Sequence, residues 1–250
     1  MNLPEFFRDN PSAALGFSGG VDSSYLLYAA MQAGARVRAY YVRTLFQPAF
    51  ELADARRLAA QLGADMTVLT IDVLADDAVA ANPENRCYFC KKRIFGAIAA
   101  RALEDGYTVL LDGTNASDDA GDRPGMRALR ELSVRSPLRE CGLTKPEIRR
   151  LSREAGLFTW DKPAYACLAT RIPAGTAITA ERLDATERAE NLLFSLGFTD
   201  FRVRLFGGAA RIQVPAGQMR RVLEHRAEIK AALGSDYTAV LLDLEARDEP

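Results

Sequence analysis

The chain has 250 residues, and 48% of them are hydrophobic, so it can form one large domain or one domain with a smaller companion. Its 32 basic and 33 acidic residues nearly cancel, which disfavours both nucleic acid and membranes as partners. The sequence has no apolar stretch long enough to span a bilayer, and its first residues lack the pattern of a signal peptide. We therefore expect a cytoplasmic protein with reduced thiols.

Strand and helix signals alternate through the first two thirds of the chain. Short apolar runs predict strands, and longer periodic segments that end near glycine predict helices. The expected strands are 15–17, 37–42, 65–71 and 108–111, and the expected helices are 23–33, 51–62, 86–104 and 144–155. This alternation predicts an α/β fold with a doubly wound parallel sheet, in which ligands bind at the carboxyl ends of the strands.

The last third of the chain has a different pattern. Residues 162–179 have no clear periodicity and are expected to form a linker. The expected elements after it are a helix over 180–196, strands 201–206 and 210–214 joined at Gly207-Gly208, a helix over 218–233 and a strand over 238–244. We therefore predict a domain over 1–161, the linker 162–179 and a small C-terminal α+β domain over 180–250.

A glycine-rich loop, Ser18-Gly19-Gly20-Val21-Asp22-Ser23-Ser24, connects the first strand to the first helix of this pattern. A helix N-terminus attracts anions, and adjacent glycines let the backbone approach a phosphate closely. The loop resembles the SGGxDS motif of the PP-loop ATP pyrophosphatases, which cleave ATP between its α and β phosphates. The candidate nucleotide-binding residues are Ser18, Gly19, Gly20, Asp22, Ser23 and Ser24, with Asp22 also a candidate ligand of Mg²⁺. The alternative is a serine-rich turn that only caps the helix.

A second polar turn, Asp112-Gly113-Thr114-Asn115, ends the strand at 108–111. Thr114 and Asn115 could bind the adenine or ribose of a nucleotide from there. Asp118 and Asp119 follow and could hold Mg²⁺. The guanidinium of Arg123 could clamp a phosphate or a carboxylate. The alternatives are a polar turn and a solvated arginine.

The four cysteines are interpreted as metal or chemical sites before disulfides. Cys87 and Cys90 open the helix over 86–104, where thiolates are favoured, but a single CxxC is ambiguous. It could be a redox pair, half of a zinc or iron–sulfur site, or two core cysteines. Cys167 lies in the predicted linker, a position that suits chemistry. Cys141 has no such context, and we expect it to be structural.

The resemblance becomes specific when the motifs are taken together. After the glycine loop come, in this order, Arg-Cys-Tyr-Phe-Cys-Lys-Lys, Asp-Gly-Thr-Asn, Asp-Arg-Pro-Gly, Ala-Cys-Leu-Ala-Thr-Arg-Ile-Pro and Phe-Arg-Val-Arg. Together they resemble the LarE family, whose members insert sulfur during synthesis of the nickel-pincer nucleotide cofactor. The resemblance covers nearly the whole chain. It implies that ATP adenylates a carboxylate of pyridinium-3,5-biscarboxylic acid mononucleotide, and that sulfur then displaces AMP.

The resemblance also implies roles for single residues. Cys167 matches the cysteine that attacks the acyl adenylate and, in the sacrificial branch of the family, loses its sulfur. Cys87 and Cys90 match a different branch, in which three thiolates including Cys167 hold a [4Fe-4S] cluster with one open iron, and we favour this second interpretation. Glu190, Arg202 and Arg204 match residues near the active site.

Several expectations complete this interpretation. Arg202 and Arg204 alternate on one strand and so face the same side, which suits a substrate with carboxylates and a phosphate. Lys91, Lys92 and Lys162 could neutralise the leaving pyrophosphate. The resemblance implies a homo-oligomer and a separate sulfur donor. The alternatives are a tRNA thiolase, an amidating synthetase, and a nucleotide or iron–sulfur sensor without turnover.

Overall fold

The computed structural model describes residues 1–118, 124–163 and 165–247. The chain forms two compact units, of which the first comprises Met1–Val73 and Asn85–Ala164 and the second comprises Leu74–Glu84 and Tyr165–Pro250. Residues 74–84 therefore leave the first unit between a strand and a helix and pack within the second. The predicted boundaries of the domains and the linker stay a prediction.

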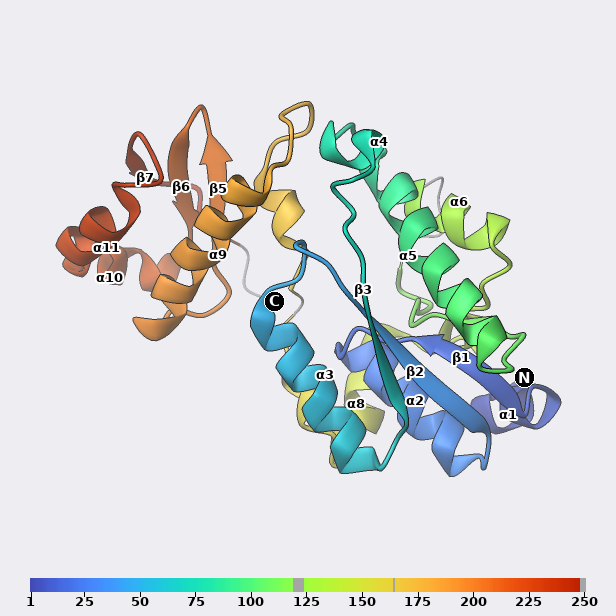
Figure 1. Cartoon of the computed structure of the whole chain (residues 1–250). Helices are drawn as coiled ribbons and strands as arrows, with labels where there is room; N and C mark the ends of the chain where they lie inside the picture. Colours follow the sequence, from blue (N-terminus) through green and yellow to red (C-terminus); the bar gives the residue numbers. More distant parts are fainter. Residues whose placement is uncertain (119–123, 164, 248–250) are drawn as a thin grey trace. The chain divides into compact units, whose positions relative to one another are not determined.

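A parallel four-stranded sheet forms the centre of the first unit, with the order β3-β2-β1-β4 (Figure 1). The strands are β1 (Ser12–Gly16), β2 (Arg36–Arg43), β3 (Met66–Thr70) and β4 (Leu110–Leu111). The chain proceeds outward from β1 to β3 and then returns to the other side of β1 for β4. This order confirms the α/β prediction and places a topological switch point between β1 and β4, where such sheets bind ligands.

Helices flank this sheet. They are α1 (Leu3–Asp9), α2 (Val21–Gln32), α3 (Ala49–Leu62), α5 (Arg86–Glu104), α6 (Pro124–Glu131), α7 (Pro137–Glu140) and α8 (Lys145–Glu154), with a 3-10 helix at Phe158–Asp161. The predicted bounds of α5 are confirmed, and Glu147 accepts a hydrogen bond from the Thr144 amide in the expected capping box of α8. The sequence analysis did not predict α1, α6 and α7. In α1 the overlooked signal is a capping box between Asn2 and Glu5.

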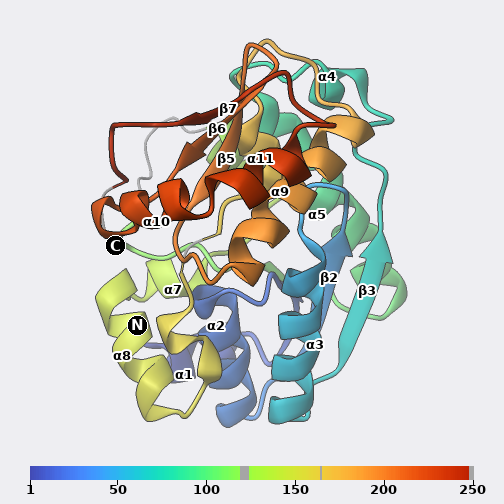
Figure 2. The same ribbon diagram turned by 90° about the vertical axis from the view of Figure 1, so that its left-hand side faces the viewer.

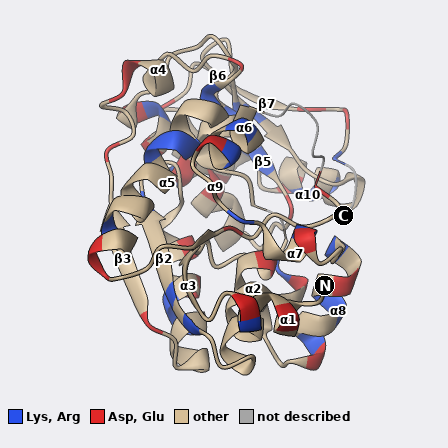
Figure 3. Cartoon of the chain, turned by 90° about the vertical axis from the view of Figure 1, so that its right-hand side faces the viewer, with Lys and Arg blue, Asp and Glu red and all other residues tan. Residues whose placement is uncertain are grey.

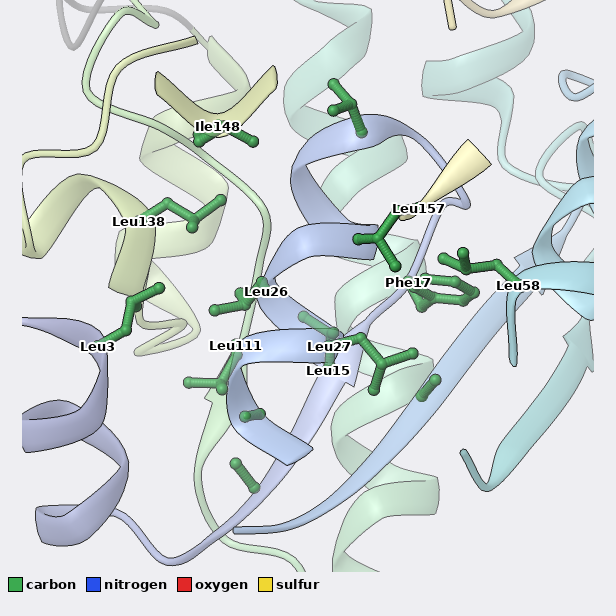
Figure 4. Close-up of a cluster of buried hydrophobic side chains, with 14 of the residues drawn as sticks. Leu3, Leu15, Phe17, Leu26, Leu27, Leu58, Leu111, Leu138, Ile148 and Leu157 are labelled. Carbon is green, nitrogen blue, oxygen red and sulfur yellow. The ribbon is translucent and has the colours of Figure 1, made fainter. Parts of the chain in front are cut away.

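Both faces of the sheet are covered, because alternate residues of each strand point to opposite sides. Leu15 of β1 packs against Leu26 of α2 and Leu58 of α3 in one buried cluster (Figure 4). Helices α2, α3 and α8 lie on this face (Figure 2). Ala14 and Tyr40 point to the opposite face and belong to a second cluster with residues of α5 and α6. Burial on both faces explains why strands β1 and β4 are mostly apolar.

The second unit is a small α+β structure. Its helices and strands are α4 (Asp77–Ala80), α9 (Ala180–Ser195), β5 (Arg202–Phe206), β6 (Ala209–Gln213), α10 (Met219–Glu224), α11 (Arg226–Leu233) and β7 (Val240–Leu242), with 3-10 helices at Leu168–Arg171 and Ala216–Gln218. Strands β5 and β6 form the predicted hairpin, and Gly207 and Gly208 both have the positive φ that its turn requires. The predicted helix 218–233 is two helices, because His225 has a ψ of 10° and turns the axis.

The surface helices carry mixed charge, as the near-zero net charge leads one to expect. Acidic and basic side chains are interspersed along α8 (Figure 3), and Arg150 pairs with Glu154 at 2.7 Å. Such exposed pairs add little stability. Within the described ranges, no helix has both the length and the apolar character needed to cross a bilayer.

Candidate active site

The glycine loop lies at the carboxyl end of β1. Gly19 has φ +73°, and a Cβ at this position would lie 3.0 Å from the Cβ of Ala55 on α3. Both observations restrict the position to glycine. The Ser23 hydroxyl donates to the Gly20 carbonyl and accepts a hydrogen bond from the Ser18 amide, both at 3.3 Å. These two serines therefore set the shape of the loop, while Ser24 is fully buried.

The N-terminus of α2 has no side-chain cap. Gly20 is its N-cap residue and provides no side-chain hydrogen bond to the first turn. The backbone N–H groups of a first helical turn have no partners inside the helix and carry partial positive charge. The loop and the helix together can therefore receive a phosphate group.

The second predicted turn meets the glycine loop. A Cβ on Gly113 would lie 3.0 Å from the backbone nitrogen of Ser23, so the strand end after β4 packs directly against the start of α2. Asn115 Nδ2 donates to Asp22 Oδ1 at 3.4 Å. Asp22 and Asn115 thus converge from two strand ends on the two sides of the switch point.

Lys145 joins this pair, and the sequence analysis missed it. Its Nζ lies 2.5 Å from Asp22 Oδ2, across 123 residues of sequence. Burial raises the pKa of Asp22, and the hydrogen bond and charge of Lys145 oppose that rise. The one available signal was the position of Lys145 directly after the helix cap Thr144, which fixes the start of α8 but does not reveal its partner.

The remaining residues of the second turn mostly bind each other. Thr114 donates to the buried carboxylate of Asp112, which also accepts a bond of 2.6 Å from Ser136. Asp118 accepts a hydrogen bond of 2.9 Å from the Asn115 backbone amide, which closes the turn over residues 115–118. These bonds hold the backbone that presents Asn115. The predicted ligands Asp119 and Arg123 lie outside the described residues.

Lys162 is already engaged by carboxylates. Its Nζ lies 2.8 Å from Glu51 and 2.8 Å from Asp54, both on α3. Its carbonyl accepts from Arg149 Nη2 at 3.0 Å. A role in neutralising pyrophosphate would require Lys162 to exchange these two carboxylates for phosphate oxygens.

Cys87 and Cys90 lie in the first turn of α5, as predicted. Cys87 is exposed and Cys90 is half-buried, and no acidic residue stands in this turn. Tyr88, between them, donates a 2.7 Å hydrogen bond to Glu131 of α6, which also accepts from Lys92 and Arg127. This contact ties the cysteine-bearing turn to α6.

All four cysteines lie in the described part of the chain and are reduced thiols. Burial raises the pKa of Cys141, which packs against the first hydrophobic cluster, in line with a structural role. Within the described ranges there is no group of three His, Cys, Asp or Glu side chains able to hold a metal ion. Cys87 and Cys90 belong to the first unit and Cys167 to the second, so the convergence of the three thiols stays a prediction.

Cys167 is half-buried and is the N-cap residue of the 3-10 helix Leu168–Arg171. Its carbonyl accepts from the Thr170 amide at 2.9 Å, from the Thr170 hydroxyl at 2.8 Å and from Arg171 Nη1 at 3.3 Å. Arg171 also donates to the Ala166 carbonyl at 2.7 Å. The backbone that carries the thiol is therefore held on both sides of Cys167.

Arg171 and Glu190 form a buried ion pair that the sequence analysis did not predict. Their side chains are 0% and 1% exposed, and the guanidinium donates to the carboxylate at 2.9 and 3.1 Å. Glu190 also accepts from the Val203 amide at 3.0 Å and from the Tyr165 hydroxyl. Glu190 therefore positions Arg171, and through it the Cys167 turn.

Arg202 and Arg204 stand two residues apart on β5 and share one face of the strand. Arg202 is buried and its guanidinium lies 5.4 Å from the ring centre of Tyr165, and Arg204 donates to the Thr170 carbonyl at 2.7 Å. Burial first, and then the charges of Arg171 and Arg247, lower the pKa of both. Glu190 pairs with Arg171, and Asp200 pairs with Arg202 and Arg247, so the arginines still leave an excess of positive charge that suits an anionic ligand.

Comparisons with known proteins identify the family of this chain. Residues 8–121, which include the glycine loop and the second turn, match the asparagine synthase family. An uncharacterized protein of Synechocystis is 38% identical over 89% of this chain and 84% of its own length. The pyridinium-3,5-bisthiocarboxylic acid mononucleotide synthase of Lactiplantibacillus plantarum is 32% identical over 95% of this chain and 87% of its own length. The chain belongs to the LarE family.

This LarE family member is an ATP-dependent sulfurtransferase, as predicted from the motifs. The tRNA-specific 2-thiouridylase of Thermotoga maritima is a more distant relative, 24% identical over 58% of this chain and 52% of its own length. The shared part explains why a tRNA thiolase was a reasonable alternative.

Proposed function

We propose that this protein adenylates a carboxylate of pyridinium-3,5-biscarboxylic acid mononucleotide with ATP and then replaces AMP with sulfur. The observation that supports this most directly is the meeting of Asp22, Asn115 and Lys145 beside the open N-terminus of α2. It occurs in a chain that aligns over 95% of its length with a synthase of the corresponding bisthiocarboxylic acid.

In the first step, an oxygen of the substrate carboxylate attacks the α-phosphorus of ATP, and pyrophosphate leaves. The phosphates lie on the glycine loop and the first amides of α2, while Thr114 and Asn115 face the nucleoside. Asp22 would hold Mg²⁺ when MgATP binds, and Lys145, which contacts Asp22 Oδ2 in this structure, would then be placed to bind a phosphate oxygen. We keep Arg123 as a phosphate ligand. Lys91, Lys92 and Lys162 are further candidates for neutralising the pyrophosphate.

In the second step, a sulfur nucleophile attacks the acyl carbon of the adenylate, and AMP leaves to give the thiocarboxylate. Arg202 and Arg204 bind the anionic groups of the substrate, since both guanidinium groups lie on one face of β5 and Arg204 contacts the Cys167 turn through the Thr170 carbonyl. Glu190 and Arg171 act as positioning residues for the Cys167 turn.

We propose that the sulfur is delivered at a [4Fe-4S] cluster held by Cys87, Cys90 and Cys167. Two of the three proposed ligands support this, because Cys87 and Cys90 are reduced thiols one helical turn apart, with no carboxylate in the first turn of α5. When bound, such a cluster with one open iron would supply a sulfide. The alternative is attack by the Cys167 thiolate to form a thioester, followed by loss of the Cys167 α-proton, which releases the thiocarboxylate and leaves dehydroalanine.

The test is anaerobic turnover of the reconstituted protein with ATP, the pyridinium mononucleotide and added inorganic sulfide. We expect AMP, pyrophosphate and thiocarboxylate in equal amounts, with repeated turnover and an unchanged protein mass. Cys87→Ala should lose the iron–sulfur absorption, whereas the matched control Cys141→Ala should keep it. Loss of one hydrogen sulfide from the protein per product would instead establish the sacrificial route. No AMP with this substrate would refute the proposed function and favour a sensor.

A tRNA thiolase remains the second candidate because of the shared PP-loop region. The net charge of −1 does not favour tRNA binding. Saturable, salt-dependent binding of tRNA by the purified protein would support this candidate against the proposed one. The homo-oligomer, the sulfur donor and the cytoplasmic location stay predictions.

A further inference from the structure

One side chain from a distant part of the sequence holds the loop that follows Cys167. The two N–H groups of Asn82 Nδ2 are shared among the carbonyl oxygens of Ile172, Pro173 and Thr176, at 3.2, 2.8 and 3.0 Å. The backbone of the Asn82 segment adds two more bonds of 2.8 Å, from the Gly175 amide to the Asn82 carbonyl and from Ile178 to Ala80. All of these residues belong to the second unit.

Asn82 is buried and has a backbone conformation that few residue types adopt. It is 1% exposed and has φ +54°, a conformation that asparagine tolerates better than most residues. Its position in the sequence is also distinctive, because it lies within the segment that leaves the first unit and is followed five residues later by Cys87.

The hydrogen bonds of Asn82 hold the end of the Cys167 turn, that is, the 3-10 helix Leu168–Arg171 with its cap residues Cys167 and Ile172. The 3-10 helix Leu168–Arg171 begins at Cys167 and ends at Ile172. Arg171, paired with Glu190, holds the beginning of this turn through the Cys167 carbonyl. Asn82 holds its end through the Ile172 carbonyl. The turn that carries the thiol is therefore clamped at two points, by two side chains that do not share a partner in the bonds described.

We propose that Asn82 is a positioning residue for sulfur transfer: its amide fixes the turn that carries Cys167, through which sulfur reaches the acyl adenylate in either proposed route, as a cluster ligand or as the nucleophile. The proposal rests on the proposed function for its kinetic readout. If the turn is loosened, the adenylate still forms, but water competes with sulfur for the acyl carbon. Attack by water releases AMP and restores the carboxylate, so ATP is consumed without thiocarboxylate.

The kinetic experiment compares the ratio of AMP to thiocarboxylate in Asn82→Gly and in the wild-type protein. Glycine accepts the positive φ and removes the side chain with its amide. We expect the ratio to rise about tenfold, which is the effect of losing roughly one net hydrogen bond, while the affinity for MgATP stays unchanged. Ser133→Gly is the matched control, because Ser133 has the same φ of 54° in the first unit, and it should leave the ratio unchanged. Asn82→Asp replaces the donor with a carboxylate that the three carbonyl oxygens repel, and it should raise the ratio at least as much.

A second measurement does not depend on turnover. Alkylation of the half-buried Cys167 should become about tenfold faster in Asn82→Gly, and amide exchange should increase at residues 172–178, while Cys87 reacts at its former rate. An unchanged AMP ratio in an active enzyme overturns the proposal. If the wild-type protein makes no AMP, the proposed function fails, and the alkylation rate alone decides: an unchanged rate overturns the role of Asn82 as well.

Discussion

Replacement of Glu190 by glutamine tests the view that one buried carboxylate organises the second unit. The variant keeps the size of the side chain and one carbonyl oxygen, which can still accept from the Val203 amide and from Arg171 Nε. It loses the second oxygen, which accepts from Arg171 Nη2 at 3.1 Å and from Tyr165. The Arg171 guanidinium, 0% exposed, then has no counter-ion in this pair.

The expected cost follows from that burial. Removing one partner of a buried ion pair destabilises a protein by about 3–5 kcal/mol, because the remaining charge is left in a poorly polarisable environment. This is a large part of the total stability of a domain, which is about 5–15 kcal/mol. We therefore expect Glu190→Gln to lower the free energy of unfolding of the second unit by about 3 kcal/mol or more.

The measurement is urea denaturation followed by circular dichroism, with amide exchange at β5 to show that the second unit is the part affected. The matched control is Glu154→Gln, which removes one partner of the exposed pair with Arg150, whose side chains are 61% and 59% exposed. This control should cost about 0.5 kcal/mol or less. If the two variants lowered the free energy of unfolding equally, the conclusion that the buried Glu190 carboxylate stabilises the second unit would be refuted.

Three further predictions concern the nucleotide site. Burial raises the pKa of Asp22, so its carboxylate takes up a proton at a higher pH than an ordinary aspartate does. MgATP affinity, measured by calorimetry, should therefore begin to fall at a higher pH than an ordinary aspartate ligand would give, whereas Asp22→Asn should bind MgATP weakly without this pH dependence. A flat wild-type profile would contradict the metal role of Asp22. Lys145→Met should lower kcat/KM for ATP about 10- to 100-fold, since a charge-assisted hydrogen bond contributes about 1.5–3 kcal/mol. The control Lys230→Met, on the exposed surface of α11, should leave kcat/KM unchanged, and equal values for the two variants would count against a role of Lys145. Gly113→Ala should weaken ATP binding, because its Cβ would lie 3.0 Å from the backbone nitrogen of Ser23 in α2. Gly96→Ala, whose Cβ would have open space around it, should bind ATP normally. Normal binding by both variants would mean that the packing of residue 113 against α2 can adjust.

The sequence predicted those elements whose signals are local. The bounds of α5 are the predicted ones, the capping box of α8 is present, and the Gly207-Gly208 hairpin has the required backbone. Each depends on a few neighbouring residues. The same reasoning missed α6 and α7, which are short and lie in a region rich in turn residues, and it joined α10 and α11, whose break at His225 has no sequence signal that we can name.

The sequence by itself determined that the glycine loop and the second polar turn both end strands, and the alternation of strands and helices placed them at one edge of a sheet. Only the tertiary structure showed that Lys145 contacts Asp22, that Arg171 contacts Glu190 and that Asn82 contacts the loop after Cys167. The physical reason is that a charge or an amide has no preferred partner in the sequence. Its partner is the complementary group that packing of distant segments brings within hydrogen-bond distance, and burial then makes that single choice favourable.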